Sequence, residues 1–270
     1  MRWTRPGHRL MMITGATGFL GSHLVDASDA GRWELLAESS GSLDIRRRDA
    51  VIDRIHTWKP NVVVHLAYRR GDRQVIVDGT RNVAEGAAAA GARLIHMSTD
   101  VVFAGRPQPY TEHDRPDAVI DYGRWKAEAE AAAYAVNPTS LAVRTSLLYG
   151  TERQAVCQTD VADALDGRSR MQFFTDEYRC PAHAADVAAA LVALADRPDV
   201  TGVLHVAGPQ AVSRAQLAQT FAVWMGRDPG AVPTASLADA GVDRPGIVVL
   251  DTSAATALGL GCRSLADALR

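Results

Sequence analysis

The sequence predicts an α/β fold built on a doubly wound parallel sheet. Short apolar, β-branched runs alternate with longer alanine-rich segments of helical period through the first half of the chain. A glycine-rich turn joins the first apolar run to the first helical segment. Strands that alternate with helices pair in parallel, and the helices cover both faces of their sheet.

The glycine-rich turn is the first element of this pattern. Residues 11–13 predict a buried strand and residues 19 to about 30 predict a helix, so Gly15, Gly18 and Gly21 lie between the two. Glycine lets the backbone approach a ligand closely, and a helix start offers free N–H groups to a diphosphate. The spacing G-x-x-G-x-x-G is one residue wider at its first gap than G-x-G-x-x-G. The stretch predicts a nucleotide site; the alternative is a tight turn without function.

The second strand is expected over residues 33–37, with Glu38 at its carboxyl end. Glu38 follows Gly21 by 17 residues. A carboxylate at that place can bond ribose hydroxyls and repel a 2′-phosphate, which favours NAD over NADP. The alternative is a solvated glutamate at a strand end, and the arginines at 46–48 are close enough in sequence to reverse the preference.

The alternation of strands and helices continues to about residue 150 and becomes less regular beyond it. Further strands are expected over 61–66, 93–97, 140–144, 171–174 and 203–206, and helices over 73–90, 120–135, 155–165, 183–194 and 214–225. The strand at 61–66 delivers Ala67 and Tyr68 to the carboxyl edge of the sheet, where open α/β sheets bind ligands. We expect residues 1–150, with 183–206 returning to them, to form the nucleotide-binding domain, and 151–182 and 207–270 to form mainly a small, discontinuous substrate lobe.

Composition argues against several classes of function. A net charge of -2 and a pI near 6.4 argue against nucleic-acid binding. Three separated cysteines without a C-x-x-C and eight unclustered histidines predict neither a disulfide framework nor a metal site. No apolar run approaches about 20 residues, and the opening MRWTRPGH lacks a hydrophobic signal core. We therefore expect a cytoplasmic protein with no membrane partner.

Tyr122 and Lys126 are the strongest candidates for chemistry. They stand four residues apart near the start of a predicted helix and so share one face. An ammonium favours the phenolate and lowers the pKa of a tyrosine, which is about 10 when free. Lysine occurs only at positions 59 and 126, so a Tyr-x-x-x-Lys is a rare coincidence in this composition. The alternative is an exposed tyrosine beside a helical neighbour.

A hydroxyl at the end of the fourth predicted strand completes the candidate site. Thr99 precedes Tyr122 by 23 residues. Hydride transfer to a carbonyl builds negative charge on the oxygen, and two O–H donors stabilise that charge as it forms. Ser98 is the adjacent alternative, but side chains alternate along a strand, so only one of the two faces the site.

Four motifs together resemble an extended short-chain dehydrogenase/reductase of the NAD-dependent epimerase/dehydratase superfamily. They are T-G-A-T-G-F-L-G at 14–21, S-T-D-V-V-F at 98–103, Y-G-R-W-K at 122–126 and A-V-R-T-S-L-L-Y-G at 142–150. Within that superfamily the chain is most similar to the dTDP-4-dehydrorhamnose reductase group. Three motifs carry this similarity, namely S-T-D-x-V-F, R-T-S, and the R-P that is followed by L-D-T-S at 244–253. The resemblance covers nearly the whole chain from Leu10.

The resemblance implies a Rossmann-type sheet, a nicotinamide cofactor, and Thr99, Tyr122 and Lys126 as the catalytic residues. Lys126 would also hold the nicotinamide ribose. The expected cofactor-binding residues are Gly15, Thr17, Gly18, Phe19, Leu20, Gly21, Glu38, Asp44, Ile45, Leu66, Ala67, Tyr68, Tyr122, Lys126 and Arg144, with Asp44 and Ile45 near the adenine. The substrate candidates are Asp100, Arg179 and Arg244.

The departures from the group's pattern lie on the substrate side. Residues 176–182 read D-E-Y-R-C-P-A in place of D-Q-x-G-x-P-T. Leu147 stands where a tryptophan usually touches substrate, Ile76 where relatives often have asparagine, and Gly246 and Ile247 where polar residues are usual. No change touches the three catalytic candidates, so we expect the chemistry to be kept and the substrate to differ.

The expected activity is reduction, by NAD(P)H, of a keto group on a nucleotide-linked sugar or a similar small molecule. A 4,6-dehydratase is disfavoured because Thr99 and Asp100 are followed by Val101 instead of the glutamate that elimination needs. A 4-epimerase with tightly held NAD and a non-catalytic, dinucleotide-binding regulatory subunit are the alternatives. The helices over 73–90 and 120–135 offer a homodimer face, or serve only to pack on the sheet.

Overall fold

The computed structural model describes residues 9–28 and 32–270. The opening MRWTRPGH and the predicted end of the first helix near residue 30 lie outside the described residues. The chain divides into two units. The first comprises residues up to Thr99, Trp125–Arg144 and Val187–Leu204, and the second comprises Asp100–Arg124, Thr145–Asp186 and His205–Arg270. The second unit thus also includes residues 100–124, 145–150, 183–186 and 205–206, which the sequence predicts to be part of the nucleotide-binding domain.

A six-stranded sheet forms the centre of the first unit. Its strands are β1 (Arg9–Thr14), β2 (Trp33–Glu38), β3 (Val62–His65), β4 (Arg93–Thr99), β5 (Leu141–Thr145) and β10 (Gly202–His205), in the order β10-β5-β4-β3-β1-β2. β1 is parallel to both of its neighbours, and β3 is parallel to β4. The strand order reverses between β1 and β3. Ligands of open α/β sheets bind beyond the carboxyl ends of the strands at such a reversal.

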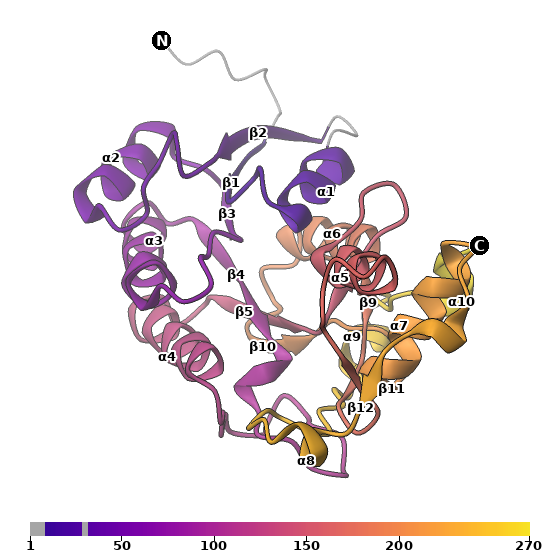
Figure 1. Cartoon of the computed structure of the whole chain (residues 1–270). Helices are drawn as coiled ribbons and strands as arrows, with labels where there is room; N and C mark the ends of the chain where they lie inside the picture. Colours follow the sequence, from indigo (N-terminus) through magenta and orange to yellow (C-terminus); the bar gives the residue numbers. More distant parts are fainter. Residues whose placement is uncertain (1–8, 29–31) are drawn as a thin grey trace. The chain divides into compact units, whose positions relative to one another are not determined.

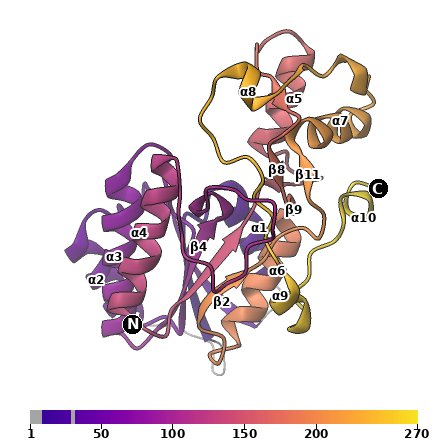
Figure 2. The same ribbon diagram turned by 90° about the horizontal axis from the view of Figure 1, so that it is seen from below.

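Helices cover both faces of this sheet, which confirms the predicted doubly wound α/β fold. Figure 1 shows α2 (Arg48–Trp58), α3 (Gly79–Ala89) and α4 (Asp121–Val136) on one face and α1 (Phe19–Ser28) and α6 (Ala184–Ala195) on the other; Figure 2 shows the same layers from below. The sequence pattern does not predict α2, because only Val51 and Ile55 of this charged helix are buried. The helix predicted over 73–90 consists of a π-helical segment, η1 (Gln74–Asp78), followed by α3.

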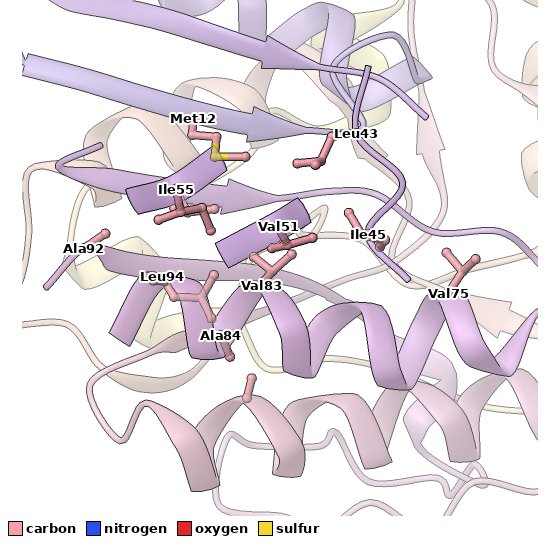
Figure 3. Packing of buried hydrophobic residues seen from close by; sticks show 13 residues of the cluster. Met12, Leu43, Ile45, Val51, Ile55, Val75, Val83, Ala84, Ala92 and Leu94 are labelled. Atoms are coloured by element: carbon pink, nitrogen blue, oxygen red, sulfur yellow. The ribbon is translucent and has the colours of Figure 1, made fainter. Parts of the chain in front are cut away.

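The apolar core of the first unit lies between the sheet and the helices α2 and α3. Met12, Val63 and Leu94 are register partners on neighbouring strands and share one face of the sheet. They pack in one cluster with Ile55 of α2 and Val83 of α3. Figure 3 labels all of these residues except Val63. Each buried aliphatic side chain contributes about 1.5–3 kcal/mol. This cluster fixes the strand register on which the polar side chains at the carboxyl edge depend.

The second unit contains short strands and helices. The strands pair as β8 (Tyr178–Arg179) with β11 (Val212–Ser213), β7 (Phe173–Phe174) with β12 (Thr234–Ala235), and β6 (Leu148–Tyr149) with β9 (Ala182–His183). The helices are α5 (Val156–Leu165), α7 (Arg214–Trp224), α8 (Leu237–Ala240), α9 (Ser253–Ala257) and α10 (Leu265–Ala268). Tyr149, Phe173 and Phe221 form its core with α5 and α7, which lie side by side in Figure 2. Within the described residues, no helix combines the length and apolar character needed to cross a membrane.

Candidate functional site

The turn between β1 and α1 is packed so closely that its first and last glycines cannot carry a side chain. Gly15 has a φ of 75°, and a Cβ there would lie 2.7 Å from the backbone nitrogen of Ala67. A Cβ on Gly21 would lie 2.2 Å from the carbonyl oxygen of Gly15. The backbone N–H of Gly18 donates to that same carbonyl at 3.0 Å. The turn therefore holds the start of α1 at the carboxyl end of β1, and the first N–H groups of a helix are the ones that can bind an anion.

A cavity of about 380 Å³ lies at the carboxyl ends of β1, β2 and β3. Nine of the predicted cofactor residues line it, namely Gly15, Thr17, Gly18, Glu38, Asp44, Ile45, Leu66, Ala67 and Tyr68. The remaining six do not line it, namely Phe19, Leu20, Gly21, Tyr122, Lys126 and Arg144. Seven further lining residues were absent from the predicted cofactor set, namely Thr14, Ser39, Ser40, Leu43, Arg46, Arg69 and Val75. Ser39 and Ser40 could have been found, since they directly follow the predicted strand end at Glu38.

The carboxylate of Glu38 is buried and has two partners. The hydroxyl of Ser42 donates to its Oε2 at 2.5 Å, and Nη1 of Arg54, from α2, lies 3.2 Å from its Oε1. Elsewhere on the cavity wall, Arg46 pairs with Asp44 at 2.7 Å, and hydrogen bonds from this guanidinium lower the pKa of Asp44 to about 2. Each carboxylate of the wall is thus paired with an arginine.

A row of buried polar side chains crosses the carboxyl end of the sheet. Register pairs Thr14 with His65 and His65 with His96. Oγ1 of Thr14 lies 2.6 Å from Nδ1 of His65, and Oγ1 of Thr80 lies 3.0 Å from Nε2. The hydroxyl of Thr80 donates to the carbonyl of Ile76, so it accepts from Nε2, and Nδ1 accepts from Thr14. His65 is neutral, because burial lowers its pKa to about 3.

Lys126 is buried against the end of β4. Its Nζ donates to the carbonyl oxygen of Met97 at 2.6 Å and lies 3.2 Å from Nε2 of His96. Burial lowers the pKa of Lys126 to about 8, and the carboxylate of Glu130 partly opposes this shift. The ammonium is therefore charged at neutral pH but loses its proton far more easily than an exposed lysine.

Tyr122 lies one helical turn before Lys126 in α4. Gly123, the next residue, allows a close contact, because a Cβ there would lie 2.0 Å from the carbonyl oxygen of Val101. Val101 belongs to η2 (Asp100–Val102), the single 3₁₀ turn that directly follows Thr99. The first turn of α4, which contains Tyr122, thus packs against the segment that continues from Thr99.

Ser98 and Arg144 take part in a buried network around Glu130. The hydroxyl of Ser98 donates to Oε1 of Glu130, and Arg144 donates to both carboxylate oxygens at 3.0 and 2.7 Å. Ser98 therefore faces α4 and is already engaged there. Arg144, which was predicted to bind the cofactor, is held in an ion pair inside the first unit.

The three substrate candidates lie in the second unit. Asp100 and Arg179 are buried, with Oδ2 and Nε 3.7 Å apart. Arg179 also donates to the carbonyl oxygens of residues 245 and 246, each at 2.7 Å. Arg244 pairs with Glu177 at 3.3 Å, and 42% of its side chain is exposed. Of the three, Arg244 is the side chain that is open to a ligand.

The chain matches known proteins over almost its whole length. Residues 9–269 match the RmlD substrate binding domain. The dTDP-4-dehydrorhamnose reductase of Mycobacterium tuberculosis is 36% identical over 247 residues, which cover 84% of this chain and 79% of that protein. Methionine adenosyltransferase 2 subunit beta of Rattus norvegicus is 29% identical over 288 residues, which cover 95% of this chain and 84% of that protein.

The fold also has a counterpart among solved structures. A dTDP-4-dehydrorhamnose reductase of Bacillus anthracis, crystallised in complex with NADP, has a TM-score of 0.87 at 24% identity, with 97% of each chain covered. The family match, the fold and the four motifs agree with the resemblance that the sequence shows. This chain therefore belongs to the RmlD substrate-binding-domain family, among the relatives of the dTDP-4-dehydrorhamnose reductases.

Proposed function

We propose that this protein uses a nicotinamide dinucleotide to reduce a keto group on a nucleotide-linked sugar or a similar substrate. The observation that carries the proposal is the buried ammonium of Lys126, one helical turn from Tyr122 and next to the strand that ends at Thr99. This set of groups can protonate and stabilise an oxygen that gains negative charge. The 36% identity to a dTDP-4-dehydrorhamnose reductase supports the substrate class.

The cavity of the first unit fits the adenosine and diphosphate parts of such a cofactor. The glycine turn leaves no room for a Cβ at Gly15 or Gly21, and the start of α1 follows it directly. Free N–H groups at a helix start favour a diphosphate. When bound, the reduced dinucleotide would supply the hydride. The crystallised relative from Bacillus anthracis, which holds NADP, supports this use of the fold.

The chain's own residues would handle the proton and the oxygen. We assign proton donation to the phenol of Tyr122, and to Lys126 the stabilisation of the phenolate that remains. Thr99 would donate a second hydrogen bond to the substrate oxygen, since the hydroxyl of Ser98 already donates to Glu130. The second unit would bind the substrate, with Arg244 as its ligand-facing cation.

A turnover assay with a matched pair of variants tests this proposal. The purified protein would be assayed on a panel of nucleotide 4-keto sugars with NADH and with NADPH. Tyr122→Phe should lower kcat by about 10³-fold and leave dinucleotide affinity within a few-fold, because only the proton donor is lost. Tyr134→Phe, on an exposed tyrosine of the same helix, is the control and should keep full activity. Turnover that survives in Tyr122→Phe would show that the proton donor is assigned wrongly.

For the cofactor we propose that both NADH and NADPH are accepted. Glu38 favours NAD by its position, but the Ser42 hydroxyl donates to one of its oxygens, and the positive charge of Arg54, 3.2 Å from the other, offsets its own. A neutralised carboxylate repels a 2′-phosphate less. We therefore expect kcat/KM values for the two cofactors that lie within about tenfold of each other.

A regulatory subunit is the second candidate, because the match to methionine adenosyltransferase 2 subunit beta covers 95% of this chain. Such a protein would bind a dinucleotide and gain thermal stability from it, but it would turn over no sugar of the panel. Dinucleotide that remains bound through purification, together with epimerisation of a sugar, would instead favour the 4-epimerase.

A further inference from the structure

His96 holds one ring nitrogen at Lys126 and leaves the other without a partner. Its Nε2 lies 3.2 Å from Nζ of Lys126. Its Nδ1 is buried and has no hydrogen-bond partner among the residues that the structure describes. Leaving a buried polar atom unpaired is unfavourable for folding. A leucine or phenylalanine would avoid that penalty, which raises the question of what the ring provides.

The charges around Lys126 fix the direction of the hydrogen bond. The titratable groups near Nζ are His96 and His65 on the sheet and Glu130 on α4, with Tyr122 one turn away on the same helix. Burial and the Lys126 ammonium lower the pKa of His96 well below its usual range, so the ring is neutral at neutral pH. A neutral imidazole accepts at one nitrogen and carries the proton on the other. Nε2 therefore accepts from Lys126, and Nδ1 carries the proton.

The ring of His96 is held in place by the row of polar residues across the sheet. It stacks on the ring of His65 with 5.3 Å between centroids and 27° between planes. His65 in turn is fixed on both sides by Thr14 and Thr80. The backbone N–H of Ala67 lies 3.4 Å from the hydroxyl oxygen of Thr14, which continues the row to the wall of the cavity. Nε2 is thus a rigid acceptor, fixed by residues of β1, β3 and α3.

We propose that His96 is a positioning residue for Lys126. Its Nε2 and the carbonyl oxygen of Met97 take two of the three N–H groups of the buried ammonium, which orients the third. The third N–H would point to the ribose of the dinucleotide, and only this last step rests on the proposed function. A histidine serves here because its neutral ring offers an acceptor to the ammonium, where a carboxylate would bring a charge and an aliphatic side chain would bring no acceptor.

The two lysines of the chain allow a direct test by NMR. Protein labelled with ¹³C-lysine gives side-chain signals from Lys126 and from the exposed Lys59, which serves as an internal reference. The Lys126 signal should titrate near pH 8 in the unmodified protein. In His96→Phe the midpoint should fall by about one pH unit, because the ammonium loses an acceptor. His96→Gln should restore it, since the amide oxygen can replace Nε2. His205→Phe, a buried histidine of the second unit, should not shift it.

Two results would overturn the proposal independently. One is a Lys126 midpoint that is the same in His96→Phe as in the unmodified protein. The other is a set of ¹⁵N ring shifts that place the His96 proton on Nε2. This measurement uses the unmodified protein, so it does not depend on whether a variant folds. Neither measurement depends on catalysis. A protein without reductase turnover but with a His96-dependent midpoint would refute the proposed function alone, and an active protein with an unresponsive midpoint would refute this inference alone.

Discussion

Lys126 sets the pH range in which the proposed site can work. Burial lowers the pKa of this ammonium from 10.5 to about 8, so its charge is present at neutral pH and is lost as the pH rises through 8. Reduction of a ketone needs that charge, because it stabilises the phenolate left on Tyr122. The proposal therefore requires a descending limb of activity on the alkaline side.

The pH dependence can be measured directly. We expect kcat/KM for ketone reduction to be level from about pH 6 to about pH 7.5 and to fall by about tenfold per pH unit above 8. The measurement is initial rate at low substrate concentration, corrected for the stability of the cofactor at each pH. A kcat/KM that rises between pH 8 and 9 would contradict the role assigned to the ammonium.

Arg54 controls the charge that a cofactor meets at Glu38. Arg54→Met would remove the partner cation at 3.2 Å and leave the carboxylate balanced only by the Ser42 hydroxyl. We expect kcat/KM with NADPH to fall by about tenfold more than with NADH, because only NADPH carries a 2′-phosphate. Arg47→Met, on an exposed neighbour outside the cavity lining, is the matched control. An equal loss for both cofactors would show that Glu38 does not lie near the 2′-position.

Among the secondary-structure elements, α1 depends most directly on one residue. A Cβ on Gly21 would lie 2.2 Å from the carbonyl oxygen of Gly15, so Gly21→Ala must push α1 away from the turn. We expect unfolding free energy to drop by about 2 kcal/mol and dinucleotide affinity to drop with it. Gly261→Ala is the control, since its nearest neighbour would be a side-chain atom at 3.6 Å. Thermal melts with and without NADPH measure both effects, and an unchanged melt would contradict the packing argument.

The ion pair between β5 and α4 allows a test of whether Arg144 stabilises the fold or binds the cofactor. In the structure this guanidinium donates to both oxygens of Glu130 within the first unit, and both side chains are almost fully buried. Arg144→Met leaves a buried carboxylate without its partner, so we expect a loss of about 3 kcal/mol in stability. Dinucleotide affinity at a temperature where the variant is folded should stay within a few-fold. A large loss of affinity with unchanged stability would instead support the cofactor role that the motif resemblance implies.

For the whole molecule, the two units should give separate ligand footprints. The glycine turn and its cavity lie in the first unit, whereas Arg179 and Arg244 lie in the second. We expect NADPH to slow hydrogen exchange in peptides that cover residues 10–21 and 62–68. A dTDP nucleotide should slow exchange in peptides that cover residues 173–180 and 237–247. Hydrogen-exchange mass spectrometry with each ligand alone tests this, and a dTDP footprint confined to the first unit would refute a substrate role for the second.

Local patterns account for most of what could be predicted from the sequence. The glycine turn, the alternation of strands and helices and the spacing of Tyr122 and Lys126 are each encoded within a few consecutive residues, where backbone geometry and helical period act directly. The exception among the elements of the sheet layer is α2, whose two buried residues give too weak a helical pattern. The π-helical start of the segment at 74–89 also lacks a signal in the periodicity.

The sequence by itself determined the fold class, the family and the candidate catalytic residues, because each depends on neighbours along the chain. Only the tertiary structure decided which partner each buried charge has: Arg54 for Glu38, Glu130 for Arg144, and His96 for Lys126. Those partners come from strands and helices that are distant in sequence and meet through the register of the sheet. A buried charge has to be paired, and packing selects the partner from many candidates that look alike in the sequence.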